Sequence, residues 1–356
     1  MAEIHPIFVF EVAAAIDLDQ AERSLIGAER TTFRHRGRAA SLFQYRPAPL
    51  RVTQDGARIP VGQWRTASVV DLVLYDFGAA SVAYHVAVDG DLQALRDASL
   101  ALREDDGLWA DARQRVGALL QSVAAAAQKP RIADFSEDYT IFGLTETPGG
   151  ITAAEFCERH AGLIAQILRP DSGELSSEEI AAATELRISF GPSDVTIVDW
   201  DGAFVVDPDP EDVRAVLEFA NVQLLEMRWL DLQVDDAIER SYQVLARGRD
   251  WRSFWPTGTA GDVRQVAELQ LESAVLLERV SNALKVFGEE YLARIYRLAA
   301  QRLRLRELDG TISRKLATIE SIYQKLSDRA ATVRLEALEW MVIILIAIEI
   351  ILGLLR

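Results

Sequence analysis

The chain has 356 residues, 49% of them hydrophobic and 8% aromatic, which is enough for a buried core and excludes a generally disordered chain. Its formal net charge of −16 excludes a broad basic surface of the kind that wraps nucleic acid. The single cysteine, Cys157, excludes a disulfide within the chain.

The first 208 residues carry patterns of both strands and helices. The chain begins MAEIHPIFVF, an apolar strand pattern without a basic leader, so we expect no secretory signal or transit peptide. Strand patterns that pair into hairpins cover residues 69–88 and 194–208. Helix patterns cover residues 92–126, 152–168 and 176–186. Because strands and helices do not alternate regularly, we predict an α+β domain over residues 1–208.

A basic stretch begins at Arg30 and interrupts this acidic chain. Aromatic residues, among them Phe33, lie between its arginines. The arginines considered for binding are Arg30, Arg34, Arg36 and Arg38. Arginine beside aromatic side chains can bind RNA or anionic lipid headgroups. The acidity of the whole chain favours a solvated loop instead, and both interpretations stay open.

The sequence shows no catalytic constellation. Asp76-Phe77-Gly78 matches a kinase tripeptide, but no phosphate loop or catalytic loop accompanies it, so it indicates a turn. The four histidines are spread along the chain without metal-ligand spacing. Asp199 and Asp201 could gather a divalent cation, although their spacing is typical of turns. We therefore predict no catalytic, cofactor-binding or metal-ligating residue and no cofactor.

Residues 209–336 have the pattern of a long helical hairpin that continues into a coiled coil. Asp209-Pro210-Glu211 is typical of a helix start, and Gly310 predicts a break or kink. Apolar residues near the end recur at gaps of mostly three and four, which predicts a seam between copies of the chain. The seam consists of Leu305, Leu308, Ile312, Leu316, Ile319, Tyr323, Leu326 and Val333.

Residues 337–355 have the pattern of a transmembrane anchor. From Trp340 the segment runs WMVIILIAIEIILGLL, and the indole would lie at the bilayer interface. Glu349 is either an acid tolerated near the far headgroups or a contact between helices of an oligomer. Basic residues before the segment place the N-terminal body in the cytoplasm. The alternative is a core helix or an oligomer seam without lipid.

Three stretches resemble a known family. They are DLVLYDFGAASVAYHV, VLEFANVQLLEMR and the run from YLARIYRLAAQRLRLRE to the C-terminal apolar segment. The chain resembles the family named for proteins required for meiotic nuclear division, whose organellar members are inner-membrane proteins that support mitochondrial translation. This resemblance, with no transit peptide in sight, implies a bacterial-type member, a single-pass protein of the bacterial inner membrane. It implies no catalytic residues.

The complete prediction is an α+β N-terminal domain followed by long antiparallel, coiled-coil helices and one C-terminal transmembrane helix. The leading hypothesis is a non-enzymatic, tail-anchored scaffold that forms homo-oligomers and presents its α+β domain to an unknown cytoplasmic protein partner. A second hypothesis is an RNA- or ribosome-associated membrane tether that supports translation. A third is a metal-dependent enzyme that uses Asp199 and Asp201.

Overall fold

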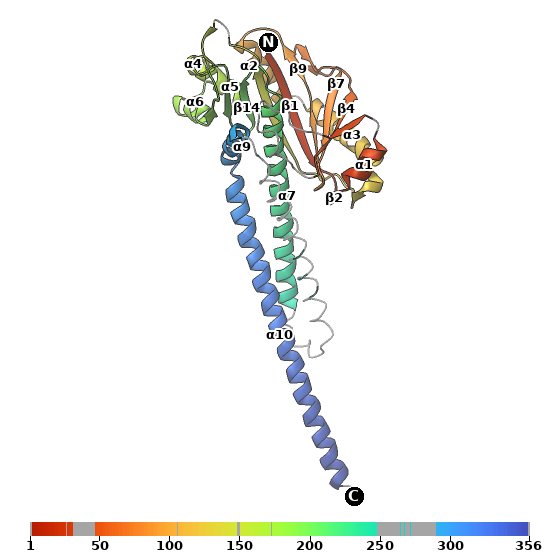
Figure 1. Ribbon diagram of the computed structural model, residues 1–356. Helices are drawn as coiled ribbons and strands as arrows, with labels where there is room; N and C mark the ends of the chain where they lie inside the picture. Colours follow the sequence, from red (N-terminus) through yellow and green to blue (C-terminus); the bar gives the residue numbers. More distant parts are fainter. Residues whose placement is uncertain are drawn as a thin grey trace. The chain divides into compact units, whose positions relative to one another are not determined.

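The computed structural model places residues in two compact units. It describes residues 2–25, 27–30, 47–104, 106–147, 150–171, 173–247 and 290–354, together with positions 264, 267 and 271. Unit 1 comprises Met1–Trp229 and Arg279–Arg306, and unit 2 comprises Leu230–Glu278 and Glu307–Arg356. Figure 1 shows their helices and strands.

Unit 1 is built on a 10-stranded sheet. In spatial order its strands are β12 (Arg187–Ile188), β13 (Val195–Val198), β14 (Gly202–Val206), β11 (Ser136–Leu144), β1 (Ala2–Glu11), β8 (Ala79–Ala83), β7 (Val69–Leu74), β4 (Leu50–Asp55) and β3 (Ala28–Arg30), and β9 (Val86–Val88) also pairs with β1. Neighbouring strands are antiparallel except β11 and β14, which are parallel. Two small sheets pair β2 (Ala15–Ile16) with β10 (Ala127–Gln128) and β5 (Pro60–Val61) with β6 (Trp64–Arg65).

The described helices include those predicted to begin near residues 92, 152, 176 and 209. They are α1 (Leu18–Ser24), α2 (Leu92–Arg103), α3 (Gly107–Ser122), the short 3-10 helix η1 (Ala124–Ala126), α4 (Ala153–Arg159), α5 (Ala161–Leu168), α6 (Ser177–Thr184), α7 (Glu211–Arg247), α9 (Glu290–Arg302) and α10 (Leu305–Leu354). Thr152 and Ser176 cap α4 and α6, each accepting a backbone N–H at 3.2 Å. The helices predicted over residues 92–126 are confirmed as α2, α3 and η1.

Both predicted hairpins are confirmed, and each depends on one glycine. Gly78, in the turn between β7 and β8, has φ +109°, and a Cβ there would lie 1.8 Å from the carbonyl oxygen of Ala13. Asp76-Phe77-Gly78, the tripeptide that matches a kinase motif, forms this turn. Gly202 opens β14, and a Cβ there would lie 2.5 Å from the carbonyl oxygen of Thr140. The absence of a side chain therefore lets each backbone approach its neighbour.

The two faces of the sheet differ in chemistry. Successive side chains of a strand point to opposite faces. On β1, residues such as Ile4 and Phe10 join the apolar core that α2, α3 and α5 complete. The alternate residues include Glu3, His5 and Glu11, and this polar face is covered by α7. The sheet therefore has an apolar layer on one side and a layer rich in charged groups on the other.

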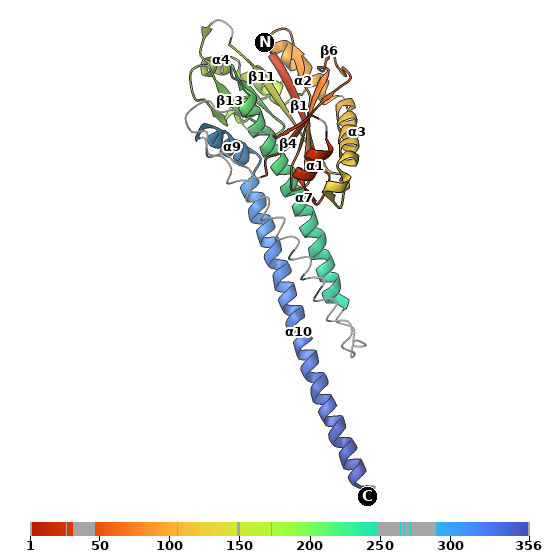
Figure 2. The same cartoon turned by 45° about the vertical axis from the view of Figure 1, so that its right-hand side comes forward.

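The first half of α7 is buried on all sides. Every residue from Val216 to Met227 is buried, although Glu218, Asn221, Gln223 and Glu226 are polar. The sheet lies on one side of this half, and α9 packs on it through Tyr296, whose hydroxyl donates to the side chain of Gln223. Figure 2 gives a second view of α7 on the sheet. A helix enclosed in this way is a central element of its unit and not a surface helix.

In unit 2 the second part of α7 contacts α10. Lys315 Nζ lies 2.6 Å from Asp231 Oδ1 and 2.8 Å from Asp235 Oδ1. Ile312 and Ile319, two of the predicted seam residues, are completely buried within the chain. The predicted break at Gly310 is wrong, because α10 continues through it without interruption.

The predicted transmembrane helix is also wrong. In the ranges that the structure describes, no helix has both the length and the apolarity needed to cross a membrane. A helix that rises about 1.5 Å per residue needs about 20 apolar residues to cross a bilayer core about 30 Å thick. The apolar run that begins at Trp340 is interrupted by the acidic Glu349. The predicted tail-anchored architecture and inner-membrane localisation depended on this helix, so they are contradicted as well.

Asp199 connects several elements of unit 1. Its carboxylate is 1% exposed and receives a two-pronged contact from Arg169, at 2.6 Å from Nε and 3.0 Å from Nη2. Arg302, at the end of α9, lies 2.7 Å from the same carboxylate. One buried anion thus joins the β13–β14 turn, the end of α5 and α9.

Replacing Asp199 with alanine should destabilise unit 1 strongly, because it leaves two arginines without their carboxylate. We expect a loss of about 3 kcal/mol in the free energy of unfolding, the low end for a broken buried ion pair. Urea unfolding followed by circular dichroism measures it. The control Asp201→Ala, at an exposed position, should change the free energy by less than about 0.5 kcal/mol. Equal losses in both variants would contradict this role for Asp199.

Candidate functional site

Two histidines that are far apart in the sequence meet on the polar face of the sheet. Pro6 of β1 has no N–H to donate, and the neighbouring strand breaks opposite it into β8 and β9. His85 lies in this break, and the ring of His5 is edge-on to it with centroids 4.9 Å apart. Glu3, two residues before His5, points to the same face. One atom from each of the three side chains lies within 4.8 Å of the others.

Glu3 is the centre of this group, here called the Glu3–His5–His85 cluster. Its Oε2 lies 3.3 Å from Nε2 of His5, and its Oε1 lies 3.5 Å from Nδ1 of His85. The other ring nitrogen of His85 lies 3.1 Å from Oδ2 of Asp71. A carboxylate in that position fixes the orientation of the imidazole and leaves Nδ1 directed at Glu3.

The protonation of the three groups differs. Burial lowers the pKa of His5 to about 4. Hydrogen bonds to Asp71 and Glu3 raise the pKa of His85 to about 9. Contacts with the two histidines hold the pKa of Glu3 well below its usual value. Near neutral pH the free cluster therefore contains a carboxylate, a neutral imidazole and an imidazolium.

Arg214, in the first turn of α7, supplies a further cation. Its Nη1 lies 2.6 Å from Nε2 of His5 and 3.8 Å from Oε2 of Glu3. Because a guanidinium only donates, the His5 nitrogen accepts, which agrees with a neutral ring. The carboxylate of Glu3 and the lone pair of His5 thus already converge on a cationic group.

The space at the cluster is small. A cavity of about 40 Å³ is lined by His5, Asp71, His85, Arg214 and Glu218, among others. A water molecule occupies about 30 Å³ of the liquid. The cavity therefore has room for an ion or a water molecule and not for an organic substrate.

The donor set suits a transition metal ion. Neutral imidazole and carboxylate are ligands of zinc and its neighbours. His85, an imidazolium in the free cluster, would release its proton when it binds the ion. Ligand atoms around a tetrahedral zinc ion, with bonds of about 2.0–2.1 Å, lie roughly 3.3 Å apart. The separations from the two oxygens of Glu3, 3.3 Å from Oε2 to His5 and 3.5 Å from Oε1 to His85, are close to that spacing.

A buried pair of acids lies farther along the same face. Glu11 of β1 and Glu226 of α7 are 7% and 4% exposed, and their carboxyl groups hydrogen-bond to each other. One further oxygen of each has no hydrogen-bond partner among the described residues. Burial raises the pKa of both groups, that of Glu226 to about 7, so the pair retains a proton near neutral pH.

Of the four arginines proposed for RNA or lipid binding, the structure describes only Arg30. Arg30 is engaged within the chain: its Nη2 lies 2.5 Å from Asp19, its Nε donates to Glu22, and its Nη1 donates to the carbonyl of Ala48. Arg34, Arg36 and Arg38 lie outside the described residues.

The two acids considered for metal binding do not form one site. Asp199 is occupied by Arg169 and Arg302, whereas the side chain of Asp201 is exposed. The lone cysteine is equally unsuited to chemistry, because burial raises the pKa of the Cys157 thiol to about 12. Asp199 and Cys157 therefore have structural roles.

The seam and anchor residues lie along α10. Leu305, Ile312 and Ile319 are buried, and Leu308, Leu316 and Tyr323 are half-buried. The side chains of Leu326 and Val333 lie outside the described set. Trp340 is 56% exposed, and Glu349 is also exposed.

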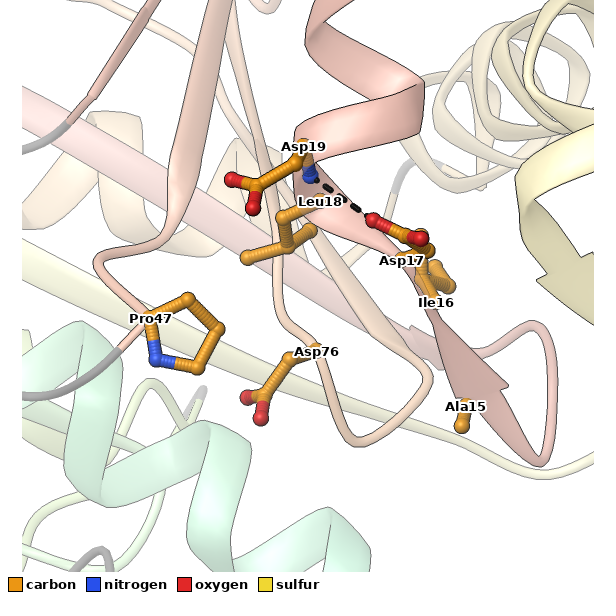
Figure 3. Close-up of a pocket in the computed structure, with 7 residues that line it drawn as sticks. All are labelled: Ala15, Ile16, Asp17, Leu18, Asp19, Pro47 and Asp76. Atoms are coloured by element: carbon orange, nitrogen blue, oxygen red, sulfur yellow. Dashed lines mark hydrogen bonds between the residues drawn. The ribbon is translucent and has the colours of Figure 1, made fainter.

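Another hollow, of about 310 Å³, lies beside α1. Figure 3 shows its three acids, Asp17, Asp19 and Asp76, with the side chain of Asp17 accepting the backbone N–H of Asp19. Asp17 serves as the helix cap, and Asp19 is paired with Arg30. Since these two carboxylates already have structural partners, the hollow indicates no ligand.

Comparison with known proteins identifies a family. The family model described as "Uncharacterized protein MJ0711, N-terminal domain" matches residues 1–212, and the chain belongs to this family. The relative from Methanocaldococcus jannaschii, "Uncharacterized protein MJ0711", is 21% identical over 222 residues. That match covers 62% of this chain and 66% of the relative, slightly less than two thirds of its length. No solved structure matches the chain. These comparisons do not confirm the resemblance to the meiotic-division family or a bacterial-type member.

The buried acids make stability depend on pH. Between pH 4.5, where a free glutamate titrates, and about 7, the folded state keeps a proton on Glu226 that the unfolded state releases. Stability should therefore fall as pH rises through this window, by on the order of 3 kcal/mol. The variant Glu226→Gln, which cannot ionise, should show a flatter profile in urea unfolding at pH 5, 6 and 7.5, values chosen to span roughly that window.

The matched control is Glu29→Gln, at an exposed position of β3. Its pH profile should follow that of the unaltered protein. Parallel profiles for all three proteins would show that Glu226 does not retain a proton.

Proposed function

We propose that the N-terminal domain binds a divalent transition-metal ion through Glu3, His5 and His85, with zinc as the best-suited ion. The observation that carries the proposal is the convergence of three ligand atoms within 4.8 Å beside a cavity of about 40 Å³. Asp71, hydrogen-bonded to the far side of His85, supplies the outer carboxylate that commonly accompanies a zinc-bound imidazole.

The role proposed for this ion is structural. The cluster lies where β1, the β8–β9 break and the first turn of α7 meet, and its cavity has no room for a substrate. An ion there would compete with Arg214 for His5, since both need the lone pair of Nε2. The arginine thus limits the affinity of the site.

Full-length protein without a histidine tag should bind close to one zinc ion per chain, measured by mass spectrometry of metal content after dialysis. His85→Ala and His5→Ala should each lose most of it, because each removes one of three ligands. Saturating zinc should raise the stability of the unaltered chain, by about 2.7 kcal/mol at a hundredfold excess over Kd.

Two further variants sharpen this experiment. His160→Ala removes an exposed histidine outside the cluster and should leave the zinc content unchanged. Arg214→Gln removes the competing cation and should tighten zinc binding. If His5→Ala and His85→Ala bind as much zinc as the unaltered chain, or if none binds, the cluster is only a network of charges that holds α7.

A second candidate function is self-association through α10. Its support is a run of large apolar side chains, from Trp340 to Leu352, that are about half exposed or more. Exposed apolar surface of this extent is typical of an interaction site. We infer that a second copy covers it, because identical helices can pack symmetrically through equivalent apolar residues.

Sedimentation of the full-length chain without detergent tests this association. We expect a concentration-dependent dimer or larger oligomer, and Ile343→Lys combined with Ile346→Lys should shift it toward monomer because it places charges in the apolar surface. Leu232→Lys, an exposed apolar position on α7, is the matched control. A monomer at every concentration would contradict the proposal.

The scaffold, translation and enzyme hypotheses from the sequence have less structural support than the two proposals above. A scaffold that presents the N-terminal domain to a protein partner is compatible with self-association. Support for translation or ribosome binding consists of the resemblance to the meiotic-division family and of the pattern around Arg34, Arg36 and Arg38. A metal-dependent enzyme using Asp199 and Asp201 has lost its main support, because Asp199 is paired with two arginines.

A further inference from the structure

A cleft of about 420 Å³ lies on the apolar side of the sheet, the side opposite the Glu3–His5–His85 cluster. Its floor is formed by β1 and β11, and its walls by α2, α3 and the end of α5. The volume is within the range of about 300–1,000 Å³ that is typical of small-molecule sites. Phe8, Leu108, Phe142 and Ile167 give it an apolar lining.

Hydrogen bonds fix the walls of the cleft. The hydroxyl of Ser99 in α2 donates to the carbonyl of Ile167 in α5 at 2.7 Å, and Arg103 donates to the carbonyl of Pro170. At the other side, the indole N–H of Trp109 donates to Ser136 Oγ at 3.0 Å. The cleft is therefore formed before any ligand arrives, which reduces the entropic cost of binding.

Acids predominate among the charged groups of the cleft. Asp106, Asp138 and Asp201 line it, against one cation, Arg103. Asp138 is on β11, and the parallel pairing of β11 with β14 brings Asp201 beside it, since Thr140 donates its N–H to the carbonyl of Asp201 at 3.0 Å. Burial and the nearby Asp201 raise the pKa of Asp138, as expected for two carboxylates that face one cavity.

Asp138 and Asp201 are solvent-exposed at the cleft, unlike the buried acids Asp199 and Glu137. Asp199 and Glu137 are neutralised by arginines. In the described ranges, neither Asp138 nor Asp201 forms an ion pair, although both line a preformed cleft. A cation bound between these two carboxylates would be attracted by both negative charges.

We propose that this cleft binds a small organic cation, an amine or guanidine with an apolar body. The charged nitrogen would donate to Asp138 and Asp201, and the apolar body would contact Phe8, Phe142 and the α5 wall. Trp109 lies at the side and already has a cation, Arg113, 5.6 Å from its ring centre. The proposal is independent of the metal site, because no residue proposed to bind the ion is proposed to bind the amine.

Isothermal titration of the full-length protein tests it with three probes: agmatine, 1,4-diaminobutane and 2-phenylethylamine. At low salt, at least one should bind with a Kd tighter than about 1 mM. Asp138→Asn and Asp201→Asn should each weaken it at least about tenfold, since each removes a charge-assisted hydrogen bond. Asp89→Asn, at an exposed position away from the cleft, is the matched control and should bind as the unaltered chain does.

A neutral probe separates charge from shape in the unaltered protein and needs no variant to fold. N-acetyl-2-phenylethylamine keeps the aromatic body and loses the positive charge, so it should bind far more weakly than its parent amine. The proposal is overturned if no amine binds, if the acetylated compound binds equally well, or if both aspartate variants keep full affinity. It is also overturned if magnesium or calcium ions bind there and amines do not.

Discussion

The structure depends on the polar face of β1 and its contact with the first half of α7. A strand in the middle of a sheet has two faces to cover, and on β1 one of them carries Glu3, His5 and Glu11. Such groups can be buried only with partners. Helix α7 supplies Arg214 beside His5 and Glu226 beside Glu11, and its Glu218 also accepts a hydrogen bond from Ser81 of β8. The pairing of these groups sets the register of α7 on the sheet.

The two candidate binding sites lie on opposite faces of this sheet. On the polar face, the strand break opposite Pro6 brings His85 to His5 and Glu3, which gives a small, nitrogen-rich cavity suited to an ion. On the apolar face, the cleft bounded by α2, α3 and α5 is about ten times larger and rich in acids. The volumes and donor groups thus favour different ligands on opposite sides of one sheet.

Much of the local structure could be predicted, because the relevant physics is local. The caps at Thr152 and Ser176, the start of α7 at Glu211 and both glycine hairpins depend on residues a few positions apart. The family match covers residues 1–212, which contain these local features.

The candidate metal site could not be found from spacing, since His5 and His85 are brought together by strand pairing. One signal was present: Glu3 and His5 alternate on an apolar strand, with Pro6 next to them. Polar residues at every second position indicate a second polar face and not a surface strand. The α10 errors have a different origin, because apolarity alone does not show whether a helix is long enough to cross a bilayer or whether one glycine breaks it.

A crystal structure of the full-length protein grown with zinc, with diffraction data collected on both sides of the zinc absorption edge, would test the metal site directly. We expect an anomalous peak about 2.0–2.1 Å from a nitrogen of His5 and of His85 and from an oxygen of Glu3. Arg214 should then have left Nε2 of His5. An empty cluster with Arg214 still bound to His5, in crystals that contain zinc elsewhere, would contradict it.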